Sequence, residues 1–234
     1  MQEEIKQYFQ GLVSMMYPRE CAACGSVLYF NECVLCLKCY IDLPRTGFHE
    51  HDDNEVSRLF WGRILVRNAT SFIIFNKDSR YRRIVHELKY NNQQQVGLEM
   101  GRLFGLELQG TPFAEANLIH PVPLHRIKLY QRGYNQSELI ARGIAQVLKI
   151  PVVTNLIIRT AVTKTQTRKS RFERWENVKD TFYIRVPEAL HDKHVLLVDD
   201  VITTGATIEA CAKALLEVNG LTISVASLAY AKLQ

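Results

Sequence analysis

The sequence lacks any long apolar run. No stretch approaches the ~18 apolar residues that a membrane-spanning helix needs, and the longest apolar segments, such as Ile223–Ala231, have the length of a strand. The first residues, Met1–Lys6, include acidic side chains, and the apolar segment of a secretory signal peptide does not follow them. We therefore expect a soluble protein of the cytoplasm.

Other absences exclude further classes of protein. The chain has no Gly-x-x-x-x-Gly-Lys-Ser/Thr loop, so a Walker-type nucleotide site is excluded. An early strand at residues 70–76 carries no acidic residues of the kind that surround the phosphoacceptor of response regulators. There is no internal repeat, no low-complexity tract and no helix-turn-helix pattern. The net charge of +5 is mild; it permits contact with phosphates, but most proteins this basic do not bind nucleic acid.

Cysteine is concentrated in one short segment. Five of the six cysteines lie between Cys21 and Cys39, and Cys211, the sixth, falls in a helical pattern that predicts a buried thiol. In a reducing compartment such a cluster favours a metal site over disulfides. Cys21-Ala-Ala-Cys24-Gly25 is typical of a zinc knuckle. The spacing leaves the second half open, because Cys33 with Cys36 and Cys36 with Cys39 can each supply the remaining pair.

Strands and helices alternate after the cysteine segment, which predicts an α/β fold with a mostly parallel sheet flanked by helices. We expect an N-terminal helix and small metal module at residues 1–45, a polar linker at 46–66, and a single α/β domain at 67–234. In such sheets, ligands bind at the carboxyl ends of the strands. The expected elements are strands at 70–75, 117–120, 195–198 and 221–229, and helices at 4–17, 81–90, 98–108, 136–148 and 207–218.

The segment Val195–Thr207 is the most informative part of the chain. Four apolar residues predict a buried strand, and Asp199 and Asp200 follow at its carboxyl end. A turn of small residues then opens a helix, whose first amides point outward and favour a phosphate. The carboxylates can accept hydrogen bonds from sugar hydroxyls or hold a hydrated Mg²⁺, so we expect a sugar-phosphate site; the alternative is a plain strand-to-helix junction. The residues of the turn are Thr203, Thr204, Gly205, Ala206 and Thr207.

Two basic segments can complete such a site. The segment His120–Lys128 is rich in proline and predicts a rigid loop that binds pyrophosphate. The segment Arg159–Arg174 is polar and lacks apolar periodicity, as a lid over a charged ligand would. On charge alone, solvated surface loops are the competing interpretation of both segments. The candidate binding residues here are His125, Arg126, Arg132, Arg159, Gln166 and Arg174.

Several short motifs follow one another in a fixed order. They are Cys-x-x-Cys, Leu88-Lys89-Tyr90, Pro121-Val-Pro-Leu124, Arg132-Gly-Tyr-Asn-Gln136, Arg159 with Thr163 and Gln166, Arg174 with Asn177-Val178, and the turn after Asp200. The turn resembles the signature of type I phosphoribosyltransferases. Together, the motifs resemble the ComF/GntX family of competence-associated, phosphoribosyltransferase-like proteins, over a region from Pro18 to the last strand.

The resemblance implies a type I phosphoribosyltransferase fold with an N-terminal zinc module. It implies that Asp199 and Asp200 contact the ribose hydroxyls of Mg²⁺-bound phosphoribosyl pyrophosphate, and that the turn holds its 5′-phosphate. It also favours Cys36 and Cys39 as zinc ligands beside Cys21 and Cys24, because the second knuckle of the family is followed by a short helix and Leu-Pro.

The resemblance implies a role in DNA uptake during natural competence or in DNA utilisation. The motifs name the donor substrate and leave the acceptor open. Two hypotheses follow. The protein is a Mg²⁺-dependent phosphoribosyltransferase, or it is a non-catalytic factor that binds single-stranded DNA and keeps the phosphoribosyl pyrophosphate site in a regulatory or vestigial form.

Overall fold

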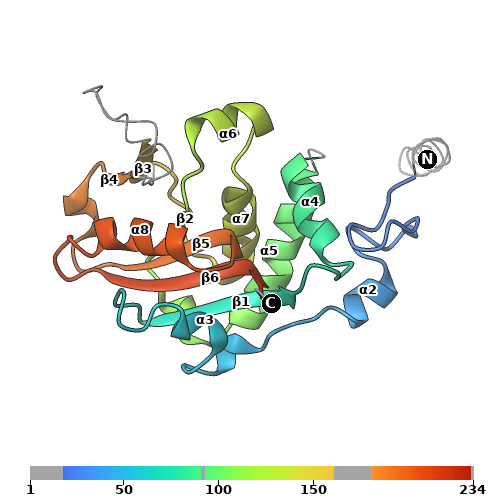
Figure 1. Cartoon of the computed structure of the whole chain (residues 1–234), viewed down its shortest axis with the longest axis horizontal. Helices are drawn as coiled ribbons and strands as arrows, with labels where there is room; N and C mark the ends of the chain where they lie inside the picture. Colours follow the sequence, from blue (N-terminus) through green and yellow to red (C-terminus); the bar gives the residue numbers. More distant parts are fainter. Residues whose placement is uncertain (1–17, 91–92, 161–180, 233–234) are drawn as a thin grey trace, which may run out of the picture.

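A parallel sheet of four strands forms the centre of the protein (Figure 1). The computed structural model describes residues 18–90, 93–160 and 181–232. The pairs β1–β6, β6–β5 and β5–β2 are all parallel, so the carboxyl ends of the four strands meet at one edge. The strands, in their spatial order, are β1 (Asn68–Phe75), β6 (Thr222–Ala231), β5 (His194–Ile202) and β2 (Leu118–Pro121).

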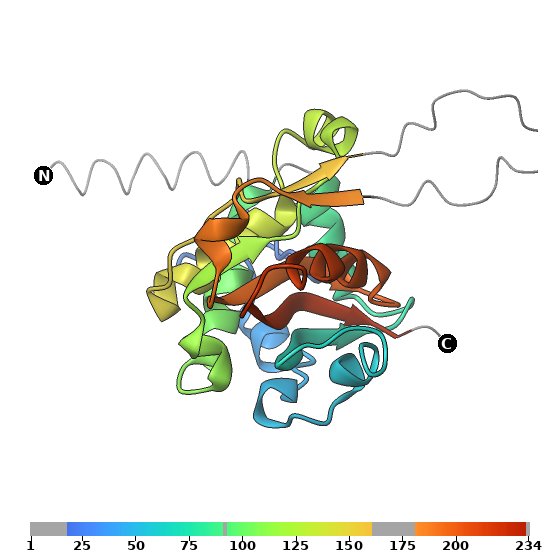
Figure 2. The same ribbon diagram turned by 90° about the vertical axis from the view of Figure 1, so that its left-hand side faces the viewer.

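Helices cover both faces of this sheet, and a small hairpin stands beside it (Figure 2). The helices are α2 (Leu37–Ile41), α3 (Glu55–Arg58), α4 (Arg82–Tyr90), α5 (Gln94–Leu108), α6 (Arg126–Arg132), α7 (Gln136–Leu148) and α8 (Ala206–Leu215). Short 3-10 helices are η1 (Phe48–Glu50), η2 (Pro112–Glu115) and η4 (Pro187–Leu190), and the antiparallel hairpin consists of β3 (Ile157–Thr160) and β4 (Thr181–Ile184). The expected α/β fold is confirmed.

Successive side chains of β5 enter two different cores. Leu196 and Val198 pack in the core that α4, α5 and α7 form on one face, and Val195 and Leu197 pack with α8 on the other. All four side chains are fully buried. Burial on both faces explains why this strand is a continuous apolar run, as strands of parallel sheets commonly are.

Glycines allow α5 and α7 to lie in close contact. A Cβ added to Gly101 would lie 2.3 Å from the carbonyl oxygen of Ile140, and one added to Gly143 would lie 2.2 Å from that of Leu98. Backbone atoms cannot move aside as a side chain can, so both positions require glycine. The contact fixes α7, whose first turn supplies residues to the site described below.

The segment 46–66, expected as a linker, contributes to the core. Val56 and Phe60 are fully buried, in the same cluster as residues of β5 and α8. The side chain of Asn54 accepts hydrogen bonds from the amides of Val56 and Ser57 at the start of α3, and it donates to the carbonyl oxygen of Ala69 at 2.9 Å. The polar residues that open this segment predict solvent exposure, but its apolar side chains pack in the same core as the sheet.

The cysteine segment also shares a core with the sheet domain. Leu28, Val34 and Leu43 are buried in the cluster that contains Ile84 of α4 and Met100 of α5. The helix expected at residues 4–17 lies outside the described residues. Among the helices of the described ranges, none combines the length and apolar character that crossing a membrane requires.

Candidate functional site

The acid pair lies in the last part of β5, at the edge where the strands end. Asp199 is buried, and its Oδ1 accepts hydrogen bonds from the Ser137 hydroxyl at 3.0 Å and from the Asp200 amide at 2.8 Å. Asp200 accepts from the Val201 amide at 2.7 Å, and its Oδ2 lies 3.0 Å from the Lys89 ammonium. Both carboxylates are therefore held in place by protein groups.

The environment of Asp199 opposes ionisation of its carboxyl group. Burial raises the pKa of Asp199 to about 7, and the adjacent charge of Asp200 adds to this, while hydrogen bonds from Asp200 and Ser137 and the charge of Lys89 act in the opposite direction. The carboxyl of Asp199 therefore holds a proton more readily than an exposed aspartate does. A ligand that donates hydroxyl hydrogens, or a cation, would stabilise the fully ionised pair.

The turn after the acid pair depends on Gly205. This residue has a φ of 75° and caps α8, and a Cβ at this position would lie 2.8 Å from Cε1 of buried Phe60. Arg63 donates to the carbonyl oxygen of Thr204 at 3.0 Å and also pairs with Glu209 of α8. The contacts with Phe60 and Arg63 hold the turn in place. The first amides of α8 have no partner within the helix, so they are available to an anion.

Hydroxyl groups of the turn face solvent. Thr203 and Thr204 are exposed, Ala206 is exposed, and Thr207 is partly exposed. The predicted arrangement, in which a strand, two acids and a small-residue turn open a helix, is present, although the acids belong to the strand itself. Exposed backbone and hydroxyl groups of this kind are suited to binding a phosphate.

The segment after β2 reaches the same edge of the sheet. The Val122 amide donates to the carbonyl oxygen of Val198 at 2.8 Å, directly before the acid pair. Residues 122–125 form a loop, as expected, but a helix, α6, begins at Arg126, within the segment expected to be loop. His125 caps this helix by accepting a hydrogen bond from the Ile127 amide at 3.3 Å. Arg126, the first residue of α6, is exposed.

Two predicted arginines of the site have partners in the protein. Arg132 donates to Oε1 of Gln136 at 2.8 Å and lies over the ring of Tyr90 at 5.6 Å. Arg159, on β3, donates to the carbonyl oxygen of Pro123 at 3.4 Å and lies over the ring of Phe182 at 5.5 Å. Arg159 therefore brings the β3–β4 hairpin beside the segment that leads into α6. The other two predicted residues, Gln166 and Arg174, lie outside the described residues.

His120 connects β2 to β3 and is not exposed to a ligand. It is buried, and burial lowers its pKa to about 4. Its Nε2 accepts a hydrogen bond from the Ile157 amide at 3.2 Å, so Nδ1 carries the proton and donates to the carbonyl oxygen of Pro121 at 2.8 Å. This neutral histidine fixes the position of the hairpin that carries Arg159.

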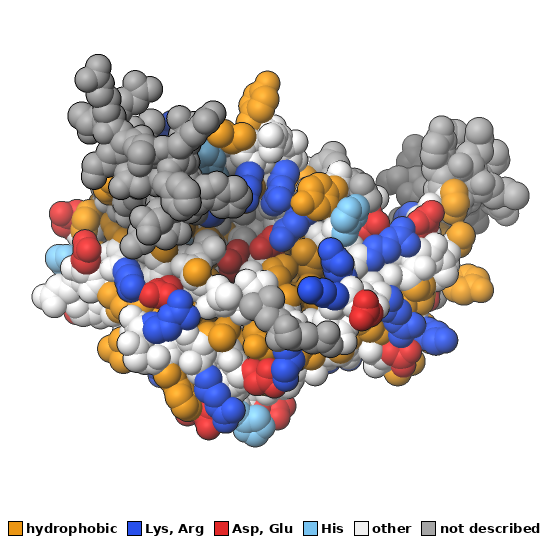
Figure 3. Space-filling model, in the orientation of Figure 1, with side chains coloured by type: hydrophobic (Ala, Val, Ile, Leu, Met, Phe, Trp, Pro, Cys, Tyr) orange, Lys and Arg blue, Asp and Glu red, His pale blue; other side chains and the backbone are white. Residues whose placement is uncertain are grey.

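Sequence reasoning missed two residues that contact the acid pair, Lys89 and Ser137. Lys89 lies in the Leu88–Tyr90 motif, and Ser137 directly follows the motif that ends at Gln136. Both are therefore within or next to segments that the sequence singled out, but their partners lie far away in the chain. On the face shown in Figure 3, Lys and Arg side chains gather over α4 and between α4 and α6, above acidic side chains at the centre of the view.

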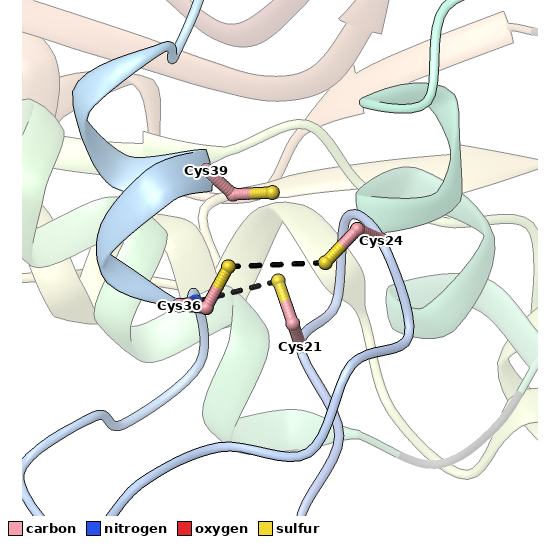
Figure 4. Close-up of side chains that lie close together, drawn as sticks. All are labelled: Cys21, Cys24, Cys36 and Cys39. Atoms are coloured by element: carbon pink, nitrogen blue, oxygen red, sulfur yellow. Dashed lines mark hydrogen bonds between the residues drawn. The ribbon is translucent and has the colours of Figure 1, made fainter.

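Four cysteines come together at the N-terminal module (Figure 4). The sulfur atoms of Cys21, Cys24, Cys36 and Cys39 all lie within 4.8 Å of one another, and Cys33 is not a member of the group. Cys24 and Cys36 have an S···S distance of 3.8 Å, and the Cys36 amide donates to the sulfur of Cys21 at 3.3 Å. A hydrogen bond with Ser26 lowers the pKa of Cys24 to about 6. This cluster can hold a metal ion.

Comparison with known proteins gives the family. Residues 135–233 match the model of the phosphoribosyl transferase domain. Competence protein F of Haemophilus influenzae is 32% identical over 153 residues, which are 63% of this chain and 67% of that protein. The chain belongs to the ComF/GntX family. Its membership is consistent with a second relative, DNA utilization protein YhgH of Escherichia coli O157:H7, which is 31% identical over 146 residues.

The match to this ComF/GntX relative is partial. It covers 61% of the chain and 63% of the YhgH protein, so the chain matches less than two thirds of that relative. Among solved structures, a glutamine phosphoribosylpyrophosphate amidotransferase from B. subtilis is 20% identical, over 60% of this chain and 30% of that one, with a TM-score of 0.40. Adenine phosphoribosyltransferase from Thermoanaerobacter pseudethanolicus is 17% identical, over 60% and 83%, with a TM-score of 0.38.

Proposed function

We propose that this ComF/GntX protein binds phosphoribosyl pyrophosphate at the end of β5. The observation that carries the proposal is the acid pair, followed by the turn that Gly205 opens into α8. Asp199 and Asp200 accept hydrogen bonds from the ribose hydroxyls, and the 5′-phosphate lies against the amides of the turn, where the helix dipole favours an anion. The domain match that includes this segment supports the assignment.

The role proposed for this binding is in DNA uptake or DNA utilisation. The relatives named Competence protein F and DNA utilization protein YhgH support it. Phosphoribosyl transfer is the reaction that the donor permits: an acceptor atom bonds to the sugar C1 as pyrophosphate leaves. Mg²⁺, bound with the donor, would neutralise the leaving pyrophosphate, and His125, Arg126, Arg132 and Arg159 are the cationic or polar groups of the described chain proposed for that side.

We also propose that the four cysteines hold a structural zinc ion. Tetrahedral zinc with Zn–S bonds of about 2.3 Å places its sulfur ligands about 3.8 Å apart, which is the distance between Cys24 and Cys36. Four thiolates leave no open position for a substrate. The ion would stabilise the module, whose core is continuous with α4 and α5.

Calorimetry with phosphoribosyl pyrophosphate and Mg²⁺ tests the proposed site. Wild type binds one equivalent, and Asp200→Asn weakens binding by roughly 10- to 100-fold, because a hydrogen bond to a charged group contributes about 1.5–3 kcal/mol. Asp53→Asn is the matched control, since Asp53 pairs with Arg58 on the surface and its loss leaves the affinity unchanged. Equal affinity in wild type and Asp200→Asn contradicts the proposal.

A second titration, with single-stranded oligonucleotides in competition, separates the two hypotheses about function. Mutual exclusion places both ligands on one surface, and independent binding places DNA on the zinc module or on another face. Release of pyrophosphate in the presence of an acceptor shows an enzyme. If oligonucleotide binds and phosphoribosyl pyrophosphate does not, the protein is a DNA-binding factor without a functional sugar-phosphate site.

A further inference from the structure

A cavity lies between the cysteine module (residues 18–45) and the helices of the sheet domain. Its volume is about 460 Å³, and its walls include Glu20 and Cys21 of the module and Arg83 and Glu87 of α4. Elsewhere the module and α4 share an apolar core. Close packing is therefore incomplete at this junction, and polar contacts that cross it help to fix the module against α4.

Arg83, in the first turn of α4, makes such contacts with the first half of the module. Its Nη2 donates a hydrogen bond to Oε2 of Glu20 at 2.8 Å, and its Nε donates to Oε1 of Glu87 at 2.9 Å. A Cβ added to Gly25 would lie 2.0 Å from Nη1 of Arg83, so the guanidinium lies directly against the turn that follows Cys24. Arg83 therefore links the first pair of cysteines to α4.

The second half of the module is connected to the chain just before α4. Asp42 accepts a hydrogen bond from Arg80 at 2.9 Å, and its carbonyl oxygen accepts one from the Tyr81 hydroxyl at 2.7 Å. These contacts hold the start of the helix. Arg83 and Glu87, one turn apart, continue the connection along the helix towards its end.

The end of α4 contacts the proposed sugar-phosphate site. The carbonyl oxygen of buried Leu88 accepts a hydrogen bond from the Tyr134 hydroxyl at 2.6 Å, and Tyr134 belongs to the segment that leads into α7. The ammonium of Lys89 lies 3.0 Å from Oδ2 of Asp200. Arg83 and Lys89 are about 9 Å apart along the helix axis, so α4 joins the cysteine module to the acid pair by a short, hydrogen-bonded element.

We propose that Arg83 is a positioning residue that couples the four cysteines to the sugar-phosphate site, so that zinc and phosphoribosyl pyrophosphate each strengthen the binding of the other. The inference rests on the proposed function, because it concerns the ligands proposed for these two sites. When the cysteines share one ion, the turn at Gly25 has one position, and Arg83 transmits that position to α4. Coupling between two binding equilibria is reciprocal, so each ligand changes the affinity for the other by the same factor.

The contact between Arg83 and Glu20 can be removed without disrupting the fold. The two side chains are 37% and 54% exposed, and ion pairs this exposed contribute little to stability. Glu20→Gln therefore leaves the cysteines and the apolar core intact while it weakens the connection to α4. This separates a role in coupling from a role in folding.

The first measurement is the zinc affinity of the protein, from equilibrium competition with a chromogenic chelator, with and without phosphoribosyl pyrophosphate and Mg²⁺. In wild type, saturating ligand raises the zinc affinity by about 10-fold, within the usual range for coupled sites. In Glu20→Gln and in Arg83→Met the increase falls below about 2-fold, while each variant still binds one equivalent of zinc.

Two further variants are the controls for this measurement. Arg80→Met removes an ion pair of similar exposure at the same junction, but the Tyr81 hydroxyl still holds the carbonyl oxygen of Asp42, so the wild-type increase remains. Asp200→Asn, at the ligand concentration that just saturates wild type, reveals any binding of zinc by the ligand itself. Loss of the increase in Arg80→Met as well would overturn the specific role of Arg83.

The second measurement is hydrogen exchange at the last turn of α4, residues 87–90, without phosphoribosyl pyrophosphate. Removal of zinc from wild type speeds exchange there by about 5-fold or more, while the amides of β6 keep their protection. Zinc-loaded Arg83→Met exchanges at 87–90 as zinc-free wild type does. Coupling that persists in both Glu20→Gln and Arg83→Met shows that the shared apolar core carries it, and this overturns the inference.

The two measurements separate this inference from the proposed function. If wild type binds no phosphoribosyl pyrophosphate, the proposed function fails, and exchange at the end of α4 decides the role of Arg83. If the ligand binds but exchange at 87–90 is the same with and without zinc, the role of Arg83 fails and the proposed function stands. Melting temperatures are compared first, and Glu20→Gln decides the matter where Arg83→Met does not fold.

Discussion

Replacing Gly205 by alanine tests whether the turn is held from beneath as the structure indicates. The backbone at this position has a φ of 75°, and a new Cβ would meet Cε1 of Phe60 at 2.8 Å. The left-handed conformation costs a non-glycine residue about 1–2 kcal/mol, and overpacking a buried aromatic ring typically costs a further ~1–3 kcal/mol. We expect Gly205→Ala to lower the free energy of unfolding by roughly 2–5 kcal/mol.

Gly110→Ala is the matched control for this variant. Gly110 has a φ of 71°, and nothing lies within 4 Å of a Cβ built there, so only the backbone contribution of about 1–2 kcal/mol is lost. Urea denaturation of the two variants isolates the contact with Phe60. Adding Phe60→Leu to Gly205→Ala should recover part of the loss, as a double-mutant coupling of about 1 kcal/mol or more. Equal losses in Gly205→Ala and Gly110→Ala, with no coupling to Phe60, would show that Phe60 does not constrain the turn.

Three further predictions concern the metal site, the helix contact and a buried histidine. Cys39→Ser should lower the bound zinc measured by elemental analysis and the melting temperature, whereas Cys33→Ser should change neither, since Cys33 is outside the sulfur cluster; equal metal loss in both would show a different ligand set. Gly101→Ala should lower the free energy of unfolding, measured by denaturation, by about 1–3 kcal/mol or more, because its Cβ would lie 2.3 Å from the carbonyl oxygen of Ile140. A near-neutral change would mean that α5 and α7 separate easily. His120 has a pKa of about 4 in the folded protein, below its unfolded value. The unfolded state therefore binds more protons between pH 4 and 6.5, and His120 lowers the free energy of unfolding by up to ~3 kcal/mol as the pH falls through that range. Stability of His120→Gln relative to wild type should therefore improve on acidification, and a constant difference between pH 7.5 and 4.5 would contradict the burial of a neutral ring.

Local patterns predicted the central strands and the turn with good accuracy. The apolar run at 195–198 lies within β5, and the small residues after Asp200 form the turn that Gly205 opens into α8. Both features follow from residues that are adjacent in sequence. The boundaries moved outward, since β5 includes the two acids, because pairing with β6 continues to Ile202.

Elements that depend on distant contacts were harder to predict. The two prolines after His120 indicate a loop, which residues 122–125 form, but the sequence did not show that α6 begins at Arg126, with His125 as its cap. The β3–β4 hairpin pairs Thr160 with Thr181 across a long stretch of intervening chain, and neither strand has a strong alternating pattern. The expected linker at 46–66 opens with a polar stretch, and its apolar side chains, among them fully buried Val56 and Phe60, do not by themselves show that they pack with β5 and α8.

The candidate site shows the same division. The acids and the turn form one continuous motif, so their arrangement could be predicted from the sequence. Lys89 and Ser137 contact these acids only because α4 and α7 pack on the sheet; Ser137 is separated from Asp199 by 62 positions. Nothing in the local sequence indicates that a lysine at the end of one helix and a serine in the first turn of another contact the same pair of acids.

The most direct test of the central claim is a crystal structure of the protein with phosphoribosyl pyrophosphate and Mg²⁺. We expect the 5′-phosphate at the amides of residues 203–207 and the ribose hydroxyls within hydrogen-bond distance of Asp199 and Asp200. Density for the ligand at another place, or a sugar phosphate bound here with both carboxylates turned away from it, would contradict the account.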